Sequence, residues 1–274
     1  MKRRALLVPS LALAAALVVS PAVSAADAGT LRERFRFHAG AALLAPAGVA
    51  PDGSVCVGTA DGYVHLLGPD GSFRWSHSVH GAVIHRPLRA GALWLVATSA
   101  ERIYALTTDG TLYWVFKPLS PPVSELALDE VGNAYFVAAD HFFYGVSAHG
   151  AVLVRAAVGA LKAGPCAGSD GAVWAENQAG NMIRAHGREV TRPAPEARPE
   201  LDLESCDLGR DARGNVWRAS DSGVLELRAA GSEGAPRSFE LASAPLLAPA
   251  WSEALSAVVV SARDGLVLAL TEAR

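Results

Sequence analysis

Five acidic residues recur at corresponding turn positions along the chain and are the first candidates for chemistry. They are Asp61, Glu101, Asp140, Asp221 and Asp264. Each stands at the turn between the second and third apolar runs of a repeated unit, so we expect all five on one face of the molecule. An acidic ring there could bind a cation or a basic partner. The alternative is ordinary turn chemistry, because Asp before Gly suits a tight hairpin.

Trp251 is the sixth residue of this predicted interaction face. It stands in the segment Pro-Ala-Trp-Ser, which we place in the turn between the first and second strands of the last unit. An exposed tryptophan at such a turn would mark a contact point for a partner. Four other tryptophans fall inside apolar runs, and we expect them to fill the core between units. These are Trp75, Trp114, Trp174 and Trp217.

Three histidines cluster between the first and second units. His77, His80 and His85 have the residue type of a metal site. However, His77 and His80 would point to opposite faces of a continuous strand, and no carboxylate or cysteine joins them locally. We therefore expect solvated loop histidines and assign no metal ligand.

An enzyme would need acidic residues that face inward around a central channel. The set that we can assemble for this purpose consists of Glu125, Asp202, Glu204 and Asp207. It does not make a catalytic constellation with defined roles. The sequence also carries no Gly-x-Ser-x-Gly elbow, phosphate-binding loop or Cys-x-x-Cys pair. We therefore assign no catalytic or cofactor-binding residue.

The candidate side chains lie within a repeat of about forty residues, and this repeat indicates the strands and turns that position them. Six similar apolar runs have their second residues at positions 63, 103, 143, 182, 224 and 266. Short alternating apolar runs between Asp-Gly or Pro-Asp-Gly turns predict antiparallel strands with one buried face. A constant period of this length predicts a β-propeller blade. We therefore predict an all-β, six-bladed propeller of four-stranded antiparallel blades.

The six predicted blades cover nearly all of the chain after its N-terminal segment. In the first blade, residues 42–50 are the expected first strand. The sixth blade runs out of sequence before a fourth strand, and the run of alternating apolar residues at 31–37 can supply it. We predict that this segment closes the ring, because closure removes unpaired edges. The predicted blade ranges are 41–80, 81–121, 122–162, 163–199, 200–243, and 244–274 together with 30–38.

The first 25 residues are interpreted as a signal peptide. Lys2, Arg3 and Arg4 precede an apolar stretch, and the small residues ending at Ala25 suit a signal peptidase. The mature propeller would then be one domain, residues 26–274, in the periplasm or outside the cell, without a membrane-spanning segment. The formal net charge of the whole chain is −3. Its mild acidity disfavours nucleic acid as a partner.

Three cysteines leave a disulfide question open. Cys166 and Cys206 occupy similar places in the first strands of the fourth and fifth predicted blades. An exported protein meets an oxidising compartment, so a bridge between them is possible if their Cα atoms come within reach. The alternative is three small buried residues. The odd count leaves at least one thiol over, and we expect it to be Cys56 inside a buried strand.

The repeat resembles that of the pyrroloquinoline-quinone (PQQ)-like propeller family. In the first blade, the residues Val-Cys-Val-Gly-Thr-Ala-Asp-Gly-Tyr-Val-His-Leu-Leu at 55–67 match its pattern, followed by Gly-Ser-Phe-Arg-Trp at 71–75. Similar runs recur at 102–114 and 264–270. The family contains quinoprotein dehydrogenases, which hold the quinone with a calcium ion, and the propeller subunit of the outer-membrane protein assembly machinery. The resemblance would allow PQQ and calcium by name, but no calcium-binding set can be carried over residue by residue.

The resemblance and the absent catalytic set together favour a non-catalytic function. We expect an exported propeller that acts as a protein- or peptide-binding scaffold in the cell envelope, with no cofactor and with an envelope or secreted protein as its partner. The irregular sector at 189–239 is the expected place for a specific surface. The alternatives are a periplasmic six-bladed enzyme of the lactonase or sugar or alcohol dehydrogenase type, and a small-ligand sensor domain.

Overall fold

The computed structural model describes residues 31–194, 209–232, 234–241 and 244–272. Within these residues the chain forms strands and turns, without an α-helix. No helix in this part of the chain is long and apolar enough to cross a membrane. The predicted signal peptide, residues 1–25, lies outside the described residues.

The described part of the chain contains 24 strands. Their bounds are β1 (Leu31–His38), β2 (Gly48–Val49), β3 (Val55–Gly58), β4 (Tyr63–Leu67), β5 (Phe73–Ser78), β6 (Leu88–Ala90), β7 (Leu93–Thr98), β8 (Arg102–Thr107), β9 (Leu112–Phe116), β10 (Ala127–Leu128), β11 (Ala134–Val137), β12 (Phe142–Val146), β13 (Val152–Ala157), β14 (Leu161–Ala167), β15 (Val173–Asn177), β16 (Met182–His186), β17 (Glu189–Thr191), β18 (Gly209–Arg210), β19 (Val216–Ala219), β20 (Val224–Arg228), β21 (Arg237–Glu240), β22 (Ala250–Ser252), β23 (Ala257–Ser261) and β24 (Leu266–Glu272).

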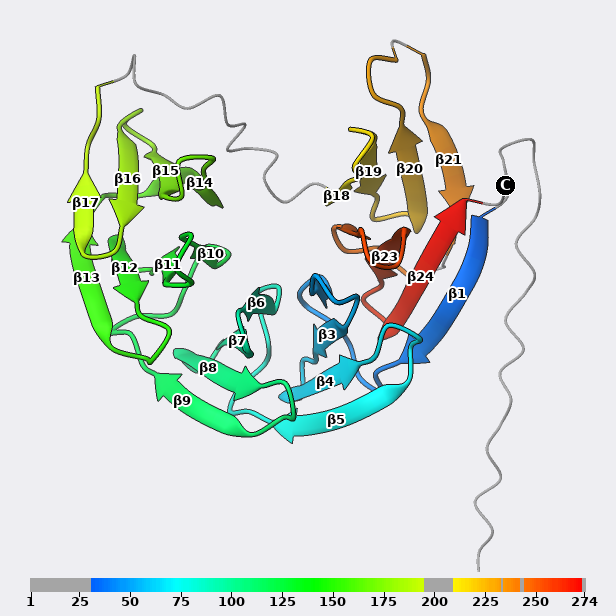
Figure 1. The fold of residues 1–274 in the computed structure, drawn as a ribbon, viewed down its shortest axis with the longest axis horizontal. Coiled ribbons are helices and arrows are strands. Elements are labelled where there is room, and N and C mark those ends of the chain that lie inside the picture. The colour runs from blue at the N-terminus through cyan, green and yellow to red at the C-terminus, as the bar shows by residue number, and fades with distance from the viewer. Residues whose placement is uncertain (1–30, 195–208, 233, 242–243, 273–274) are drawn as a thin grey trace, which may run out of the picture.

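These strands form six antiparallel sheets of four strands each, which confirms the predicted blades. The first to fifth sheets are β2–β5, β6–β9, β10–β13, β14–β17 and β18–β21, and the sixth contains β22, β23, β24 and β1. In Figure 1 the sheets follow one another around an arc, with the fourth and fifth sheets at its two ends. The residues that connect these two sheets in sequence, 195–208, lie outside the described residues. Complete closure of the ring therefore stays a prediction.

The N-terminal strand completes the sixth sheet, as predicted. β1 pairs antiparallel with β24 from Leu31↔Glu272 to His38↔Leu266, with one bulge between Glu33 and Phe35. Figure 1 shows the two strands, from opposite ends of the sequence, lying side by side. The pairing gives β24 a neighbour on its outer edge, which would otherwise present unpaired N–H and C=O groups.

The hydrophobic core lies mainly between neighbouring sheets. The second strand of four sheets, namely β3, β11, β15 and β23, is buried along its whole length. Residues from adjacent sheets share each inter-sheet cluster; Leu95 of the second sheet, for example, packs with Phe136 of the third. Cys166 and Trp174 belong to a separate cluster within the fourth sheet. Apolar burial between blades therefore holds the arc together.

We call the contact region between two neighbouring sheets a joint. Glycine turns make close contacts at three of these joints. An aromatic residue from the fourth strand of one sheet lies over the glycine in the turn between the third and fourth strands of the next sheet. The pairs are Phe35 with Gly71, Trp75 with Gly110, and Trp114 with Gly150. A Cβ atom on Gly110 would lie 2.7 Å from the Trp75 ring, and one on Gly150 would lie 2.9 Å from the Trp114 ring. These turns need glycine both for this contact and for their positive φ angles of 79–86°.

The first strand of the first sheet is shorter than predicted. Residues 42–50 were expected to form one strand, but only Gly48–Val49 is regular, and Leu43 adds a single bridge to Thr59. Crowding between Gly48 and the neighbouring second sheet explains the difference. A Cβ atom on Gly48 would overlap the carbonyl group of Pro87 in the second sheet. Neighbouring backbones come too close here for long paired strands.

Candidate interaction groove between the fifth and sixth sheets

The five predicted acids lie in turns between second and third strands, as expected. In an antiparallel four-stranded sheet, these turns share one end of the sheet, and the other turns within the sheet lie at the opposite end. Several of the acids accept hydrogen bonds from their own turns: Asp61 from the Thr59 hydroxyl and Asp264 from the backbone N–H of Leu266. Asp221 is exposed and Glu101 is half-buried with a φ angle of 57°. These contacts support the turn interpretation.

Asp140 makes an ion pair and accepts a hydrogen bond within the third sheet. Its Oδ2 atom lies 3.0 Å from Arg155 NH2 and accepts a 2.8 Å hydrogen bond from the Tyr144 hydroxyl. Burial alone would raise the pKa of Asp140, but the hydrogen bonds from Arg155 and Tyr144 outweigh it and lower the pKa. This carboxylate therefore already has a cationic partner within the chain.

The position of Trp251 differs from the prediction. It belongs to β22, the first strand of the sixth sheet, where it pairs with Val258, rather than to the following turn. The side chain is half-buried, and its Nε1–H donates to Glu253 Oε2 at 2.9 Å. Glu253 begins the turn after the first strand, so Trp251 lies toward the end of the sheet opposite the acids. The six residues of the predicted interaction face therefore do not form one surface.

The three histidines are bound to different neighbours. His77 Nδ1 lies 3.0 Å from the Gly110 carbonyl oxygen. The backbone N–H of His80 donates to the Tyr104 hydroxyl, and His85 Nε2 lies 3.2 Å from the Pro122 carbonyl oxygen. Across the described residues, no group of three or more His, Cys, Asp or Glu side chains comes together to hold a metal ion.

The acids considered for catalysis give no quinone or calcium site in the part of the chain that can be placed. Asp202, Glu204 and Asp207 lie outside the described residues. Glu125 accepts a 2.9 Å hydrogen bond from the Arg86 backbone N–H, and its other oxygen lies 3.6 Å from His85. The buried Glu176 pairs with Lys162 at 3.0 Å. These described carboxylates are separate and each has a cationic or N–H partner, so they do not fit a calcium-bound quinone.

The two cysteines within the described residues have different states. Cys56 is a free, buried thiol, as predicted, and burial raises its pKa. Cys166 is disulfide-bonded, which removes the alternative of three buried thiols. The partner considered in the sequence, Cys206, lies outside the described residues.

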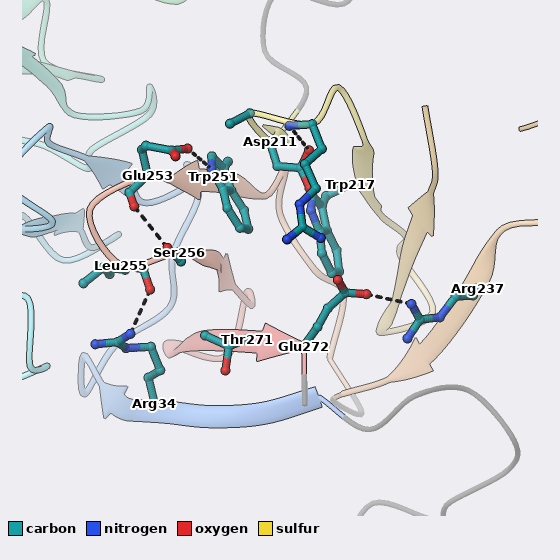
Figure 2. A pocket seen from close by; sticks show the side chains of 12 residues that line it. Arg34, Asp211, Trp217, Arg237, Trp251, Glu253, Leu255, Ser256, Thr271 and Glu272 are labelled. Carbon is teal, nitrogen blue, oxygen red and sulfur yellow. Dashed lines mark hydrogen bonds and ion pairs between the residues drawn. The ribbon is translucent and has the colours of Figure 1, made fainter. Parts of the chain in front are cut away.

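A groove of about 740 Å³ opens between the fifth and sixth sheets. Its walls come from the turn after β18, from β19 and β21, from β22 and the turn after it, and from the adjacent ends of β1 and β24. The residues that line it are Arg34, Asp211, Ala212, Arg213, Trp217, Arg237, Trp251, Glu253, Leu255, Ser256, Thr271 and Glu272. Figure 2 shows these side chains converging from both sheets. The predicted contact residue Trp251 thus belongs to this groove.

Most of the charged groups around the groove are paired with each other or with the backbone. Arg237 NH1 lies 2.6 Å from Glu272 Oε1, and Arg34 NH1 donates to the Leu255 carbonyl oxygen at 2.8 Å. Asp211 accepts hydrogen bonds from the backbone N–H groups of its own turn, including that of Arg213 at 2.9 Å. These contacts are drawn as dashed lines in Figure 2.

Trp217 is the unusual residue of this groove. Its side chain is only 2% exposed, and the buried Nε1–H has no hydrogen-bond partner among the described residues. Buried N–H groups almost always have a partner, so an orphaned donor needs an explanation. The indole is held in place by stacking on Phe239, with 6.4 Å between ring centroids.

The third sheet also has an aromatic residue at this position, and there the hydrogen-bonding group of the side chain has partners. Tyr135 occupies the second strand six residues after Asp129, as Trp217 does after Asp211. The Tyr135 hydroxyl contacts both Asp129 Oδ2 at 3.0 Å and the Gly187 carbonyl oxygen of the fourth sheet at 2.9 Å. Burial, followed by the neighbouring Asp129, raises the pKa of Tyr135. The second-strand aromatic there reaches across the joint, whereas Trp217 does not.

From the sequence, Trp217 is predicted to lie in the core between blades and is not singled out as a site residue. Two signals pointed to it. The Asp-x-x-Gly-Asn pattern at 129–133 recurs at 211–215 ahead of an aromatic residue. In addition, the sixth blade is predicted to take its third strand from the C-terminal part of the chain and its fourth strand from residues 31–37. No turn can therefore connect these two strands.

Comparison with known proteins places the fold in a family. The family model described as PQQ_2, outer membrane protein assembly factor BamB, matches residues 21–185, more than half of the chain. The chain belongs to this family. The match confirms the PQQ-like resemblance and includes the first three sheets. Of the residues that line the groove, only Arg34 falls within it.

Two individual proteins are similar to this chain. The outer membrane protein assembly factor BamB of Burkholderia pseudomallei (strain K96243) is 32% identical over 100 residues. That match covers 36% of this chain and 26% of the relative, so the chain spans about a quarter of the length of the curated relative that it matches. The solved structure of BamB from Moraxella catarrhalis is similar over 91% of this chain and 93% of that chain, with a TM-score of 0.53 and 15% identity. This second likeness shows the propeller fold.

Proposed function

We propose that this protein is a protein-binding propeller of the cell envelope that takes part in the assembly of outer-membrane proteins. The observation that carries the proposal is the match to the outer membrane protein assembly factor family over residues 21–185. The predicted signal peptide supports a periplasmic location for the mature chain. The partner would be a protein rather than a nucleic acid, in keeping with the mild net negative charge of −3.

The architecture suits a scaffold. Clusters of apolar residues between successive sheets fix the blades relative to each other, so groups on the turns are held at constant positions. Preorganised surfaces of this kind bind with a small loss of conformational entropy. The groove between the fifth and sixth sheets adds a concave site with two tryptophans, a residue type that often dominates protein interfaces.

We propose further that the protein acts without a quinone or calcium. The support is the set of internal contacts made by Glu125 and Glu176. Metal analysis of the purified mature protein, combined with PQQ and calcium reconstitution, tests this point. We expect neither stoichiometric calcium nor dye-linked dehydrogenase activity. Stoichiometric uptake of both with activity would support the enzyme alternative instead.

The main test is genetic and is combined with crosslinking in cells. Deletion of the gene should lower the amount of folded β-barrel proteins in the outer membrane, and the wild-type gene should restore it. A photo-crosslinking amino acid at Ala212, an exposed residue that lines the groove, should give adducts with outer-membrane proteins or their assembly factors. The matched control is Val131, an exposed residue in the corresponding turn of the third sheet. Unchanged outer-membrane proteins in the deletion strain, together with no such adduct from either position, would refute the proposal.

A further inference from the structure

Three joints between sheets share one hydrogen-bonding device. An aromatic side chain of one sheet donates to a main-chain carbonyl oxygen in the turn between the third and fourth strands of the next sheet. The bonds are Trp75 Nε1 to Thr108 at 2.8 Å, Trp114 Nε1 to Ala148 at 2.9 Å, and the Tyr135 hydroxyl to Gly187 at 2.9 Å. For the two tryptophans this bond satisfies the single donor of the indole, whereas the Tyr135 hydroxyl also contacts Asp129 Oδ2.

The joint between the fifth and sixth sheets has the donor but not this turn. The third and fourth strands of the sixth sheet are β24 and β1, which come from distant parts of the sequence and are not connected by a hairpin. Trp217 Nε1 is the buried donor at this joint, and no residue that the structure describes accepts a hydrogen bond from it. The corresponding space between the first and second sheets is smaller, about 590 Å³, and is bounded by Thr108 and Asp109 of the turn.

The charges around the groove indicate what such a turn would carry. Arg34, Arg213 and Arg237 all line it. Arg34 donates to the Leu255 carbonyl oxygen and Arg237 pairs with Glu272. The guanidinium group of Arg213 makes no hydrogen bond or ion pair with any described residue and is exposed. An acidic side chain on the incoming turn would give it a partner, and the joint between the first and second sheets, which Arg74 and Arg89 line, has such a turn, Thr-Asp-Gly at 108–110.

We propose that the groove binds an Asp-Gly β-turn of a partner protein, which takes the place of the hairpin missing from the sixth sheet. A main-chain carbonyl oxygen of the turn accepts the hydrogen bond from Trp217 Nε1, and the aspartate carboxylate pairs with Arg213. The turn glycine lets the backbone approach the indole, as Gly110 does at Trp75. This inference rests on the proposed protein-binding function and names the chemistry of the segment that is bound.

The probe is a cyclic peptide with the sequence of residues 106–113, whose turn occupies the joint between the first and second sheets. It is added to the mature protein labelled with ¹⁵N, and the indole N–H signals of the six tryptophans are followed by NMR. The Trp217 signal, assigned by its loss in Trp217→Phe, should shift on titration. Trp217→Phe keeps the ring but removes the donor, so it should weaken binding about fivefold, the size of one hydrogen bond.

Two further variants test the geometry. Arg213→Ala should weaken binding of the peptide about fivefold, but it should not weaken binding of a peptide with Asn in place of its aspartate. Arg213 is exposed, so this variant keeps the proposal testable if Trp217→Phe does not fold. The matched control is Trp114→Phe, whose indole already donates to Ala148, and it should leave the affinity unchanged.

Several results would overturn the proposal. These are no Trp217 shift at saturating peptide, an equal loss of affinity in Trp114→Phe, or no difference between the Asp and Asn peptides. A Trp217 signal that depends on protein concentration would assign the groove to a second copy of the chain. A signal that moves when the residues before Leu31 are removed would assign it to the protein's own N-terminal segment. If crosslinks to outer-membrane proteins persist in Trp217→Phe, Arg213→Ala cells, the scaffold function stands and this inference fails.

Discussion

Removal of the Phe35 side chain should destabilise the whole propeller, because this residue fixes the strand that completes the sixth sheet. Phe35 is 8% exposed and packs in the cluster shared by the sixth and first sheets. Its ring lies directly over Gly71 in a tight turn with a φ angle of 79°. That turn cannot easily move into the space left by a smaller side chain. Buried Phe→Ala changes cost about 3–5 kcal/mol, so we expect about 4 kcal/mol for Phe35→Ala.

The expected loss is large enough to measure by thermal unfolding. For a domain of this size, about 1 kcal/mol corresponds to about 2–4 °C, so the melting temperature should fall by roughly 8–16 °C. Circular dichroism of the mature chain gives this value, and urea unfolding gives the free energy directly. Arg36→Ala, on the same strand but exposed and paired only with Glu33, is the matched control and should change stability by less than about 1 kcal/mol.

A double-mutant cycle tests the contact itself. Gly71→Ala adds a methyl group that overlaps the Phe35 ring and also strains a positive φ angle. In a Phe35→Ala background the overlap with the ring disappears but the 2.4 Å contact with the retained Cβ atom stays, so the cost of Gly71→Ala should fall while remaining above the backbone strain of about 1–2 kcal/mol. Costs that simply add within about 0.5 kcal/mol, or a Phe35→Ala loss below 1 kcal/mol, would refute the reasoning about this joint.

Three other predictions concern acid stability, thiols and processing. Burial of Asp129, which is 5% exposed, would raise its pKa, but hydrogen bonds from Asn133 and then Tyr135 outweigh burial and lower it. The stability that Asp129 supplies above about pH 4 is therefore lost as the pH falls through its folded-state pKa. Asp129→Asn should therefore be less stable by about 1–3 kcal/mol at pH 7 in urea but flatter with pH in acid; an equally steep acid loss would contradict this. Under native conditions alkylation should leave Cys56 unmodified, and in non-reducing denaturant Cys56 but not Cys166 should react; a modified Cys166 would contradict the disulfide. Mass spectrometry of the exported protein should show cleavage after Ala25, and an uncleaved chain would contradict the signal peptide.

The sequence was sufficient to predict most of the fold. Six runs at a nearly constant period fixed the number of sheets, and the missing fourth strand of the last unit led to the pairing of residues 31–37 with the C-terminal strand. These predictions succeed because turn chemistry and strand alternation are local properties that each blade repeats. The first strand of the first sheet, residues 42–50, was overestimated, because its length depends on the approach of the second sheet at Gly48 and Pro87, which no local pattern records.

The candidate site was predicted less well, for a physical reason. The acids at the turns stand out in the sequence, but their hydrogen bonds show that turn formation explains several of them. Trp217 resembles the other core tryptophans in sequence. Trp217 stands out because its indole N–H has no hydrogen-bond partner among the described residues. That property depends on how the fifth and sixth sheets lie relative to each other, which no sequence pattern records.

The pairing of β1 with β24 has a consequence for the order in which the protein can fold. β1 is synthesised before β24; the Thr271 hydroxyl, for example, donates to the Arg32 carbonyl oxygen 239 residues away. At about 5–20 residues per second, β1 waits for its neighbour for roughly 10–50 seconds. During that time Phe35 and an unpaired strand edge are open to other chains. A chain shortened by only β24 would leave β1 without the strand that it pairs with.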